Sequence, residues 1–231
     1  MSIAENIAQV RTNIAQACAQ AGRSPEEITL VGASKMNDAA ACREAIAAGI
    51  DALGENRVQE MTAKLADNAY DGAPLHFIGH LQRNKVKQVV GKVALIQSVG
   101  SMELLEEIEK VAAREQLVQD ILLEVNIGRE EAKSGFDPDA VTAAAEAALS
   151  LPHVRVRGLM TIPPADADRD ANMRYFQEVQ ALYVDINTKL FHNELKCLSM
   201  GMSGDYMDAI RCGATMVRVG TAIFGARHYN I

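Results

Sequence analysis

The sequence contains no tryptophan, few aromatic residues of any kind (4%) and only four cysteines. The cysteines are scattered without a CxxC pair, so neither a zinc site nor a disulfide framework is predicted; they are Cys18, Cys42, Cys197 and Cys212. No apolar run approaches the ~20 residues that a membrane-spanning helix needs. The first ten residues, MSIAENIAQV, lack the basic start and continuous apolar stretch of a secretory signal. We therefore expect a cytoplasmic protein with reduced thiols.

Positively charged residues are fewer than negatively charged ones. Lysine and arginine number 23 against 30 aspartates and glutamates, which gives a net charge of −7. This balance excludes a broad basic surface for nucleic acid. Hydrophobic residues (48%) and charged residues (23%) have ordinary shares, which excludes a disordered chain, a collagen-like repeat and a disulfide-stapled miniprotein. No linker rich in Pro, Gly or Ser interrupts the chain, so residues 1–231 are expected to form a single domain.

What the sequence does contain is a regular alternation of apolar, β-branched segments with amphipathic ones. A helix is expected over residues 3–21 and one short turn over 24–27. Eight strands are then predicted at 28–34, 51–55, 75–79, 93–99, 119–126, 154–161, 195–200 and 215–220. Helical segments follow at 38–49, 57–69, 84–90, 101–115, 137–149, 168–190 and 205–213, and the last strand leads into TAIFGAR. Eight βα units favour an α/β fold, a closed (β/α)8 TIM barrel with an extra N-terminal helix, over a doubly wound open sheet.

In such a barrel the functional residues lie at the carboxyl ends of the strands. Of nine lysines, Lys35 is the one that directly follows a strongly apolar strand. Apolar walls disfavour the ammonium form of a lysine, which lowers its pKa and makes the amine a nucleophile. A lysine at a strand end can also bury only its stem and reach solvent. Position alone leaves both interpretations open.

The exits of the seventh and eighth strands are rich in glycine and hydroxyl groups, in SMGMSGD (199–205) and VRVGTAIFG (217–225). Barrels often bind phosphate at this corner, through loop amides and the start of a small extra helix. One such turn would be explained by the backbone freedom of glycine alone. Two at the same corner favour a phosphate site.

A nucleophilic lysine and a phosphate site together are compatible with two chemistries. One is a class I aldolase that forms a Schiff base with a phosphosugar, and the other is pyridoxal 5′-phosphate (PLP) held on the lysine. Aldolase lysines in barrels usually follow late strands, whereas Lys35 follows the first. This favours PLP as the cofactor.

Seven segments resemble one known family: VGASK (31–35), GENRVQE (54–60), HFIGHLQRNK (76–85), KSG (133–135), GLMTI (158–162), LSMGMSGD (198–205) and VRVGTAIFGAR (217–227). They are similar, in order and over almost the whole chain, to the pyridoxal phosphate homeostasis proteins. This is the family once described as proline-synthetase co-transcribed, and it is similar to the barrel domain of alanine racemase. The resemblance implies the alanine-racemase N-terminal-domain fold, PLP fold type III.

The resemblance also implies roles for individual residues. Lys35 would carry PLP as a Schiff base, and Arg218 would face the pyridine nitrogen. The others are implied to hold the phosphate (Ser203, Gly220 and Thr221) or to surround the ring (Asn56, His80 and Met202). Many relatives have a second lysine two positions after the first, followed by a proline; this chain has Asn37 and Asp38 there. Lys133 in KSG is present, and we interpret it as a solvated loop lysine.

An arginine at the ring nitrogen cannot accept a proton, so PLP would be a weak electron sink. Alanine racemase brings its second base on a further β-rich domain, and we expect none here because the chain ends after the eighth βα unit. We therefore predict a protein of intracellular PLP homeostasis without robust turnover. A small PLP-dependent amino acid racemase is the alternative, and a Schiff-base aldolase is less favoured.

Partner predictions follow from the same features. PLP is the expected ligand, amino acids are candidate ligands, and apo forms of PLP-dependent enzymes are candidate recipients. Nucleic acid and membranes are not expected partners, and we expect a monomer. No metal is predicted, because the histidines at 76, 153, 192 and 228 do not show metal-ligand spacing.

Overall fold

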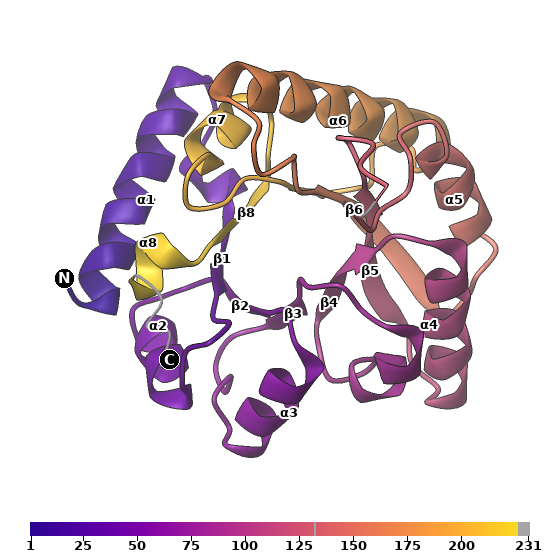
Figure 1. Cartoon of the computed structure of the whole chain (residues 1–231), viewed down its shortest axis with the longest axis horizontal. Helices are drawn as coiled ribbons and strands as arrows, with labels where there is room; N and C mark the ends of the chain where they lie inside the picture. The colour runs from indigo at the N-terminus through magenta and orange to yellow at the C-terminus, as the bar shows by residue number, and fades with distance from the viewer. Residues whose placement is uncertain (132, 226–231) are drawn as a thin grey trace.

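The computed structural model describes residues 1–131 and 133–225. Within them, eight parallel strands form a closed barrel in which each strand pairs with the next and β8 pairs with β1 (Figure 1). The strands are β1 (Thr29–Ala33), β2 (Ala52–Glu55), β3 (Leu75–Phe77), β4 (Leu95–Val99), β5 (Gln119–Val125), β6 (Val154–Thr161), β7 (Cys197–Ser199) and β8 (Met216–Val219). The predicted TIM barrel is confirmed.

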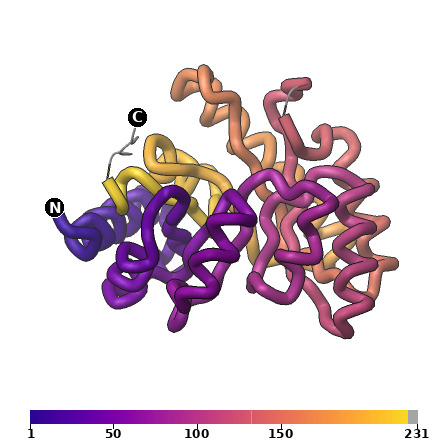
Figure 2. Tube along the Cα trace, turned by 60° about the horizontal axis from the view of Figure 1, so that its bottom comes forward, coloured from indigo at the N-terminus to yellow at the C-terminus, as the bar shows by residue number. Residues whose placement is uncertain are grey.

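Helices surround the barrel and connect its strands (Figure 1). They are α1 (Ile3–Gln20), α2 (Ala39–Ala47), α3 (Val58–Ala66), α4 (Met102–Arg114), α5 (Val141–Ala148), α6 (Arg169–Leu190), α7 (Tyr206–Arg211) and α8 (Thr221–Phe224), with 3-10 turns η1 (Pro25–Glu27) and η2 (Arg83–Gln88). The extra helix α1 packs beside α7 and α8 (Figure 1 and Figure 2), so the chain's first helix covers the outside of its last βα units. None of the described helices is long and apolar enough to span a bilayer.

Two connections differ from their predicted form. The short helical segment expected over 84–90 is a 3-10 helix, η2, at Arg83–Gln88. The helix predicted from residue 137 begins at Val141, because the chain before it first returns to β5. Phe136 N–H donates to the carbonyl of Glu124, and Phe136 O accepts from Asn126 N–H. These long-range bonds were not visible in the periodicity of the sequence.

The barrel interior changes from apolar to polar toward the carboxyl ends of the strands. An apolar layer crosses it, formed by Val31, Ala52, Leu95, Leu122, Met160 and Met216. Side chains alternate in direction along a strand, so residues two and four positions after this layer also face the interior. This alternation places Arg218 above Met216, and Lys35 four residues beyond Val31. The fold therefore positions both at the mouth.

Candidate functional site

Two adjoining cavities open at the carboxyl ends of the strands, of about 330 and 250 Å3. Both are lined by Ala33, Lys35, Met202 and Arg218. The larger cavity also contains Asn56 and His80 in its wall, and the smaller contains Ser203, Gly220 and Thr221. The structure thus brings all the predicted cofactor-binding residues around one mouth.

Arg218 is the deepest charged group of this mouth, with 3% of its surface exposed. Its Nη1 donates to Ser199 Oγ at 2.5 Å, and its Nη2 donates to the Thr161 carbonyl at 2.9 Å. Both acceptors are neutral, and within residues 1–131 and 133–225 no carboxylate forms an ion pair with it. Burial lowers the pKa of Arg218 to about 10, so the guanidinium stays charged at neutral pH. Its charge is therefore directed toward the cavity without a carboxylate in contact.

A chain of hydrogen bonds inside the barrel holds Arg218. A guanidinium only donates, so Ser199 Oγ must accept from it and give its own proton to Gln97 Oε1, 2.7 Å away. The Gln97 amide nitrogen then lies 3.0 Å from His76 Nδ1, which must accept. Burial lowers the pKa of His76 to about 4. His76 is therefore neutral, with its proton on Nε2.

Glu124 lines the larger cavity and was missed by the sequence analysis. It lies on β5 with 7% of its surface exposed, accepts from Ser134 Oγ at 3.1 Å, and has its pKa raised by burial. The available signal was the alternation: Glu124 is two residues before Asn126, which also lines the cavity. Lys133 lies nearby, but its Nζ is 2.5 Å from Glu130 Oε2. It is thus a partnered loop lysine at the rim.

The smaller cavity ends in a corner of hydroxyl and amide groups. Ser203 Oγ accepts from the backbone N–H groups of Gly220 (3.1 Å) and Ala222 (3.3 Å), which joins the loop after β7 to the start of α8. The loop turns at Gly201, with φ of +92°, where a Cβ would lie 2.8 Å from Tyr206 Cα. The two amides are held by Ser203, and the hydroxyl and amide groups gathered here are of the kind that binds an anion.

Asn56 lies in the larger cavity with its Oδ1 buried and without a hydrogen-bond partner in the described chain. Its backbone packs directly on Gly79, where a Cβ would come within 2.2 Å of the Asn56 carbonyl oxygen. Asn56 is therefore held in place with an unused acceptor. His80 and Met202 are exposed at the rim.

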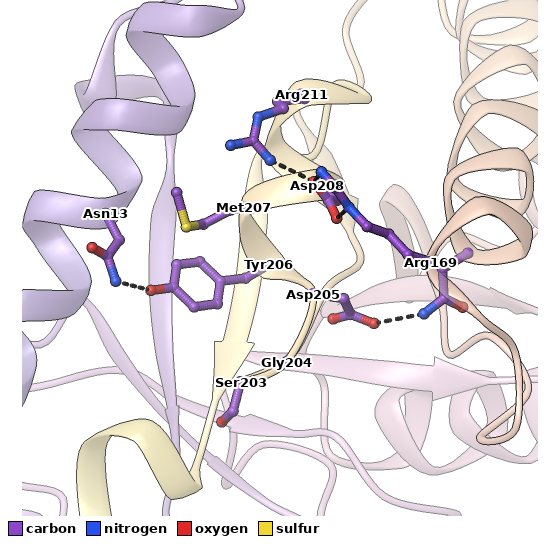
Figure 3. Close-up of a pocket in the computed structure, with 10 residues that line it drawn as sticks. Asn13, Arg169, Ser203, Gly204, Asp205, Tyr206, Met207, Asp208 and Arg211 are labelled. Atoms are coloured by element: carbon purple, nitrogen blue, oxygen red, sulfur yellow. Dashed lines mark hydrogen bonds and ion pairs between the residues drawn. The ribbon is translucent and has the colours of Figure 1, made fainter.

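The loop of residues 202–205 is also held from the outside, where a third cavity of about 540 Å3 lies between α1, α6 and α7 (Figure 3). Asp205 Oδ1 accepts from Met202 N–H at 2.6 Å, and Asn172 Nδ2 reaches Asp205 Oδ2 at 3.4 Å. Asn13 Nδ2 donates to Tyr206 Oη at 2.8 Å (Figure 3). The wall of the inner site is thus attached to the outer helices.

Comparisons with known proteins agree with this geometry. The family model described as "Alanine racemase, N-terminal domain" matches residues 6–228. The chain is 42% identical to the pyridoxal phosphate homeostasis protein of Aquifex aeolicus, over 99% of this chain and 100% of that protein. The corresponding protein of Pseudomonas aeruginosa is 41% identical, over 99% and 97%. The chain belongs to the pyridoxal phosphate homeostasis protein family.

Solved structures place the family in its fold class. PipY of Synechococcus elongatus, with PLP bound, matches with a TM-score of 0.85 at 33% identity, over 97% of this chain and 100% of that chain. An alanine racemase of Clostridium difficile matches with a TM-score of 0.73 at 17% identity, over 99% of this chain and 58% of that chain, which shows the shared barrel. In the described part of the chain, no group of three or more His, Cys, Asp or Glu is arranged to hold a metal. His228, and Ala226 and Arg227 of the last motif, lie outside the described residues.

Proposed function

We propose that this member of the pyridoxal phosphate homeostasis family binds PLP across the two adjoining cavities and serves to hold, buffer or deliver it, with PLP on Lys35 as a Schiff base. The observation that carries the proposal is that Lys35 and Arg218 line the same two cavities, and that the hydrogen-bond acceptors of Arg218 among the described residues, Ser199 Oγ and the Thr161 carbonyl, are neutral. PLP offers an aldehyde to an amine and a ring nitrogen to a donor.

The residues present fit PLP in three respects. Ser203, Gly220 and Thr221 line the end of the smaller cavity, where hydroxyl and amide groups of the kind that bind a phosphate are gathered. Asn56 Oδ1 has no partner in the described chain and offers an acceptor on the ring side. Arg218 offers a donor that contacts no carboxylate in the described chain, toward the pyridine nitrogen.

Bound PLP supplies an aldehyde that condenses with amines and a ring that withdraws electrons. Arg218 limits the second property, because a guanidinium with a pKa of about 10 donates a hydrogen bond without giving up its proton. Lys35 provides the amine, and Ser203 and Thr221 provide hydroxyl groups for the phosphate. These residues favour retention of the cofactor over proton abstraction from a bound amino acid.

The family supports homeostasis over racemisation. The relatives at 34–42% identity are named for PLP homeostasis, whereas the alanine racemases at 14–17% identity support only the fold. We further propose that the protein works in the cytoplasm as a monomer and delivers PLP to apo forms of PLP-dependent enzymes.

The test is to incubate the protein with PLP, reduce with borohydride and map the modified peptide. We expect one PLP per chain on the peptide that contains Lys35, and none in Lys35→Ala. Modification mainly at Lys133 or Lys85 would overturn the assignment. Incubation with L-amino acids and chiral analysis tests the racemase alternative, for which we expect negligible racemisation of alanine, serine and proline; turnover of ~1–10³ per second would favour the racemase.

A further inference from the structure

The backbone on both sides of Lys35 is held by one helix, α3. Lys64 Nζ donates to the carbonyl of Ser34 at 2.8 Å. The N–H of Met36 donates to Glu60 Oε2, also at 2.8 Å. Glu60 and Lys64 are four residues apart, so they lie one turn apart on the same face of α3. The two contacts therefore bracket Lys35 at the preceding and the following residue.

The turn after Lys35 has a conformation that requires support. Met36 has a φ of +62°, in the left-handed region that side chains other than glycine rarely adopt, and half of its surface is exposed. Such a backbone persists where surrounding contacts impose it. The Glu60 contact to Met36 N–H is one, and Asn37 Nδ2, which donates to the Lys35 carbonyl at 3.0 Å, is another. Asn37 thus has a structural role directly beside Lys35.

Lys64 belongs to a buried polar cluster on the outer side of the barrel. Its Nζ lies 2.5 Å from Glu55 Oε1, which also accepts from Ser34 Oγ (2.7 Å) and Tyr70 Oη (3.1 Å). Lys64 is 9% exposed and Glu55 is fully buried. Burial of two charges costs desolvation, and an apolar pair of the same shape is often at least as stable. Stability alone does not account for the pair, whereas Lys64 adds a charged side-chain donor to the Ser34 carbonyl, which also accepts from Asn37 N–H at 3.1 Å.

We propose that Glu60 and Lys64 are positioning residues for Lys35: they fix the backbone of residues 34–36 so that the Lys35 amine meets the aldehyde of PLP. Glu55 supports them by accepting from Lys64 Nζ and so holding that amine against the Ser34 carbonyl. The inference rests on the proposed function, since it assigns these residues to the reaction of Lys35 with PLP. Nothing in it requires contact between α3 and the cofactor.

A first experiment needs no cofactor. In the PLP-free protein, amide hydrogen exchange of Met36 is compared between wild type, Glu60→Ala and Gln59→Ala. A hydrogen bond to a charged group protects by about tenfold or more. We therefore expect Met36 to exchange at least about tenfold faster in Glu60→Ala. The control Gln59→Ala alters an exposed side chain of the same helix and should leave the rate unchanged. Equal protection in all three proteins would remove the contact on which the inference rests.

A second experiment measures the rate at which PLP becomes borohydride-reducible on Lys35. We expect Glu60→Ala to slow this rate by about tenfold, and Gln59→Ala to match wild type. A purely structural role for Glu60 would lower the melting temperature without changing the rate. Wild-type rates in Glu60→Ala would overturn the inference while leaving the proposed function intact. Failure of wild type itself to form the adduct would overturn the proposed function, and the hydrogen-exchange result would still stand.

Lys64 requires a paired substitution, because Lys64→Met alone leaves Glu55 buried without its cation. The double variant Glu55→Gln/Lys64→Met removes both charges at nearly constant volume. We expect it to melt close to wild type and to form the PLP adduct about as slowly as Glu60→Ala. A double variant that folds and reacts at the wild-type rate would exclude Lys64 as a positioning residue.

Discussion

Lys35 and Arg218 line the same mouth, but the structure supports them in opposite ways. Behind Lys35, outside the barrel, lies a charged cluster in which Lys64 pairs with Glu55. Around Arg218, inside the barrel, the contacts are neutral, beginning with Ser199 and the Thr161 carbonyl. An ion pair can fix backbone without touching a ligand. Neutral acceptors hold a guanidinium while leaving its charge for a ligand, so each region has the support that its own chemistry needs.

The sharpest test of the lysine side of this comparison is Lys35→Ala. We expect it to abolish covalent attachment of PLP completely while the protein keeps its fold, because a residue at the barrel mouth contributes little to the core. Mass spectrometry after borohydride reduction measures attachment, and circular dichroism measures the fold. Retention of one reducible PLP per chain would move the nucleophile to another lysine.

Substitutions at Ser203 and Thr221, which line the smaller cavity, should weaken the binding of PLP without preventing its covalent attachment to Lys35. Ser203→Ala and Thr221→Ala should each remove one hydrogen bond to a dianion, worth ~1.5–3 kcal/mol or about ten- to a hundredfold in affinity. Reducible attachment to Lys35 should remain at saturating PLP. Titration with PLP and with pyridoxal, which lacks the phosphate, provides the control: the two substitutions should leave the weak pyridoxal binding unchanged. Equal affinity of wild type for both compounds would show that this corner is not the anchor.

Ser199 is one of the neutral acceptors that hold Arg218, so removing its hydroxyl group should destabilise the folded protein. Ser199→Ala leaves Arg218 Nη1 and Gln97 Oε1 buried without their partner, which should lower the free energy of unfolding by about 1–3 kcal/mol. Urea denaturation measures this, with Ser150→Ala as the control at an exposed hydroxyl. An unchanged urea midpoint would mean that the hydrogen bond between Ser199 and the Arg218 guanidinium does not contribute to stability.

His76, the last member of the hydrogen-bond chain that begins at Arg218, should make the folding stability depend on pH. His76 has a pKa of about 4 in the folded protein and about 6.5 when unfolded, so between these values the unfolded state binds more protons. Above pH ~6.5 the histidine is neutral in both states and has no effect on the pH dependence; as the pH falls from 6.5 toward 4 it lowers the folding stability, by up to ~1.4 kcal/mol per pH unit. Glu124 acts in the opposite direction, because its pKa is raised. The difference in urea stability between wild type and His76→Gln isolates the histidine, and a difference that stays constant from pH 7 to 4 would contradict the neutral assignment.

The sequence was sufficient for the barrel and for the residues at strand exits, since both follow from local patterns. Strand and helix periods alternate along the chain, and alternation within a strand places Lys35 and Arg218 on the interior. The supports of these two residues were not predictable in the same way. Gln97 and Ser199 are 102 positions apart, and Lys64 lies 30 positions from Ser34. Which polar side chains meet across such distances depends on the register of the closed barrel.

Glu124 illustrates the remaining limit. It lies within a strand whose neighbours are apolar, so alternation assigns it to the interior only when it is counted back from Asn126 at the strand exit. The delayed start of α5 has a similar origin, because Phe136 pairs with β5 before the helix begins.

The contact between β7 and β8 has a consequence for the abundance of the protein in a cell. Between the named strands β7 and β8 the pair Ser199 and Met216 is in register, and backbone bonds such as Arg218 N–H to the Gly201 carbonyl continue the contact. Beyond them Ser203 connects the two strand exits. A phosphate held at this corner would bind the folded barrel and not the unfolded chain, so occupancy adds directly to folding stability. Stability in turn sets how often the chain opens to proteases. The abundance of such a protein would then follow the supply of the compound it holds, with no separate sensor.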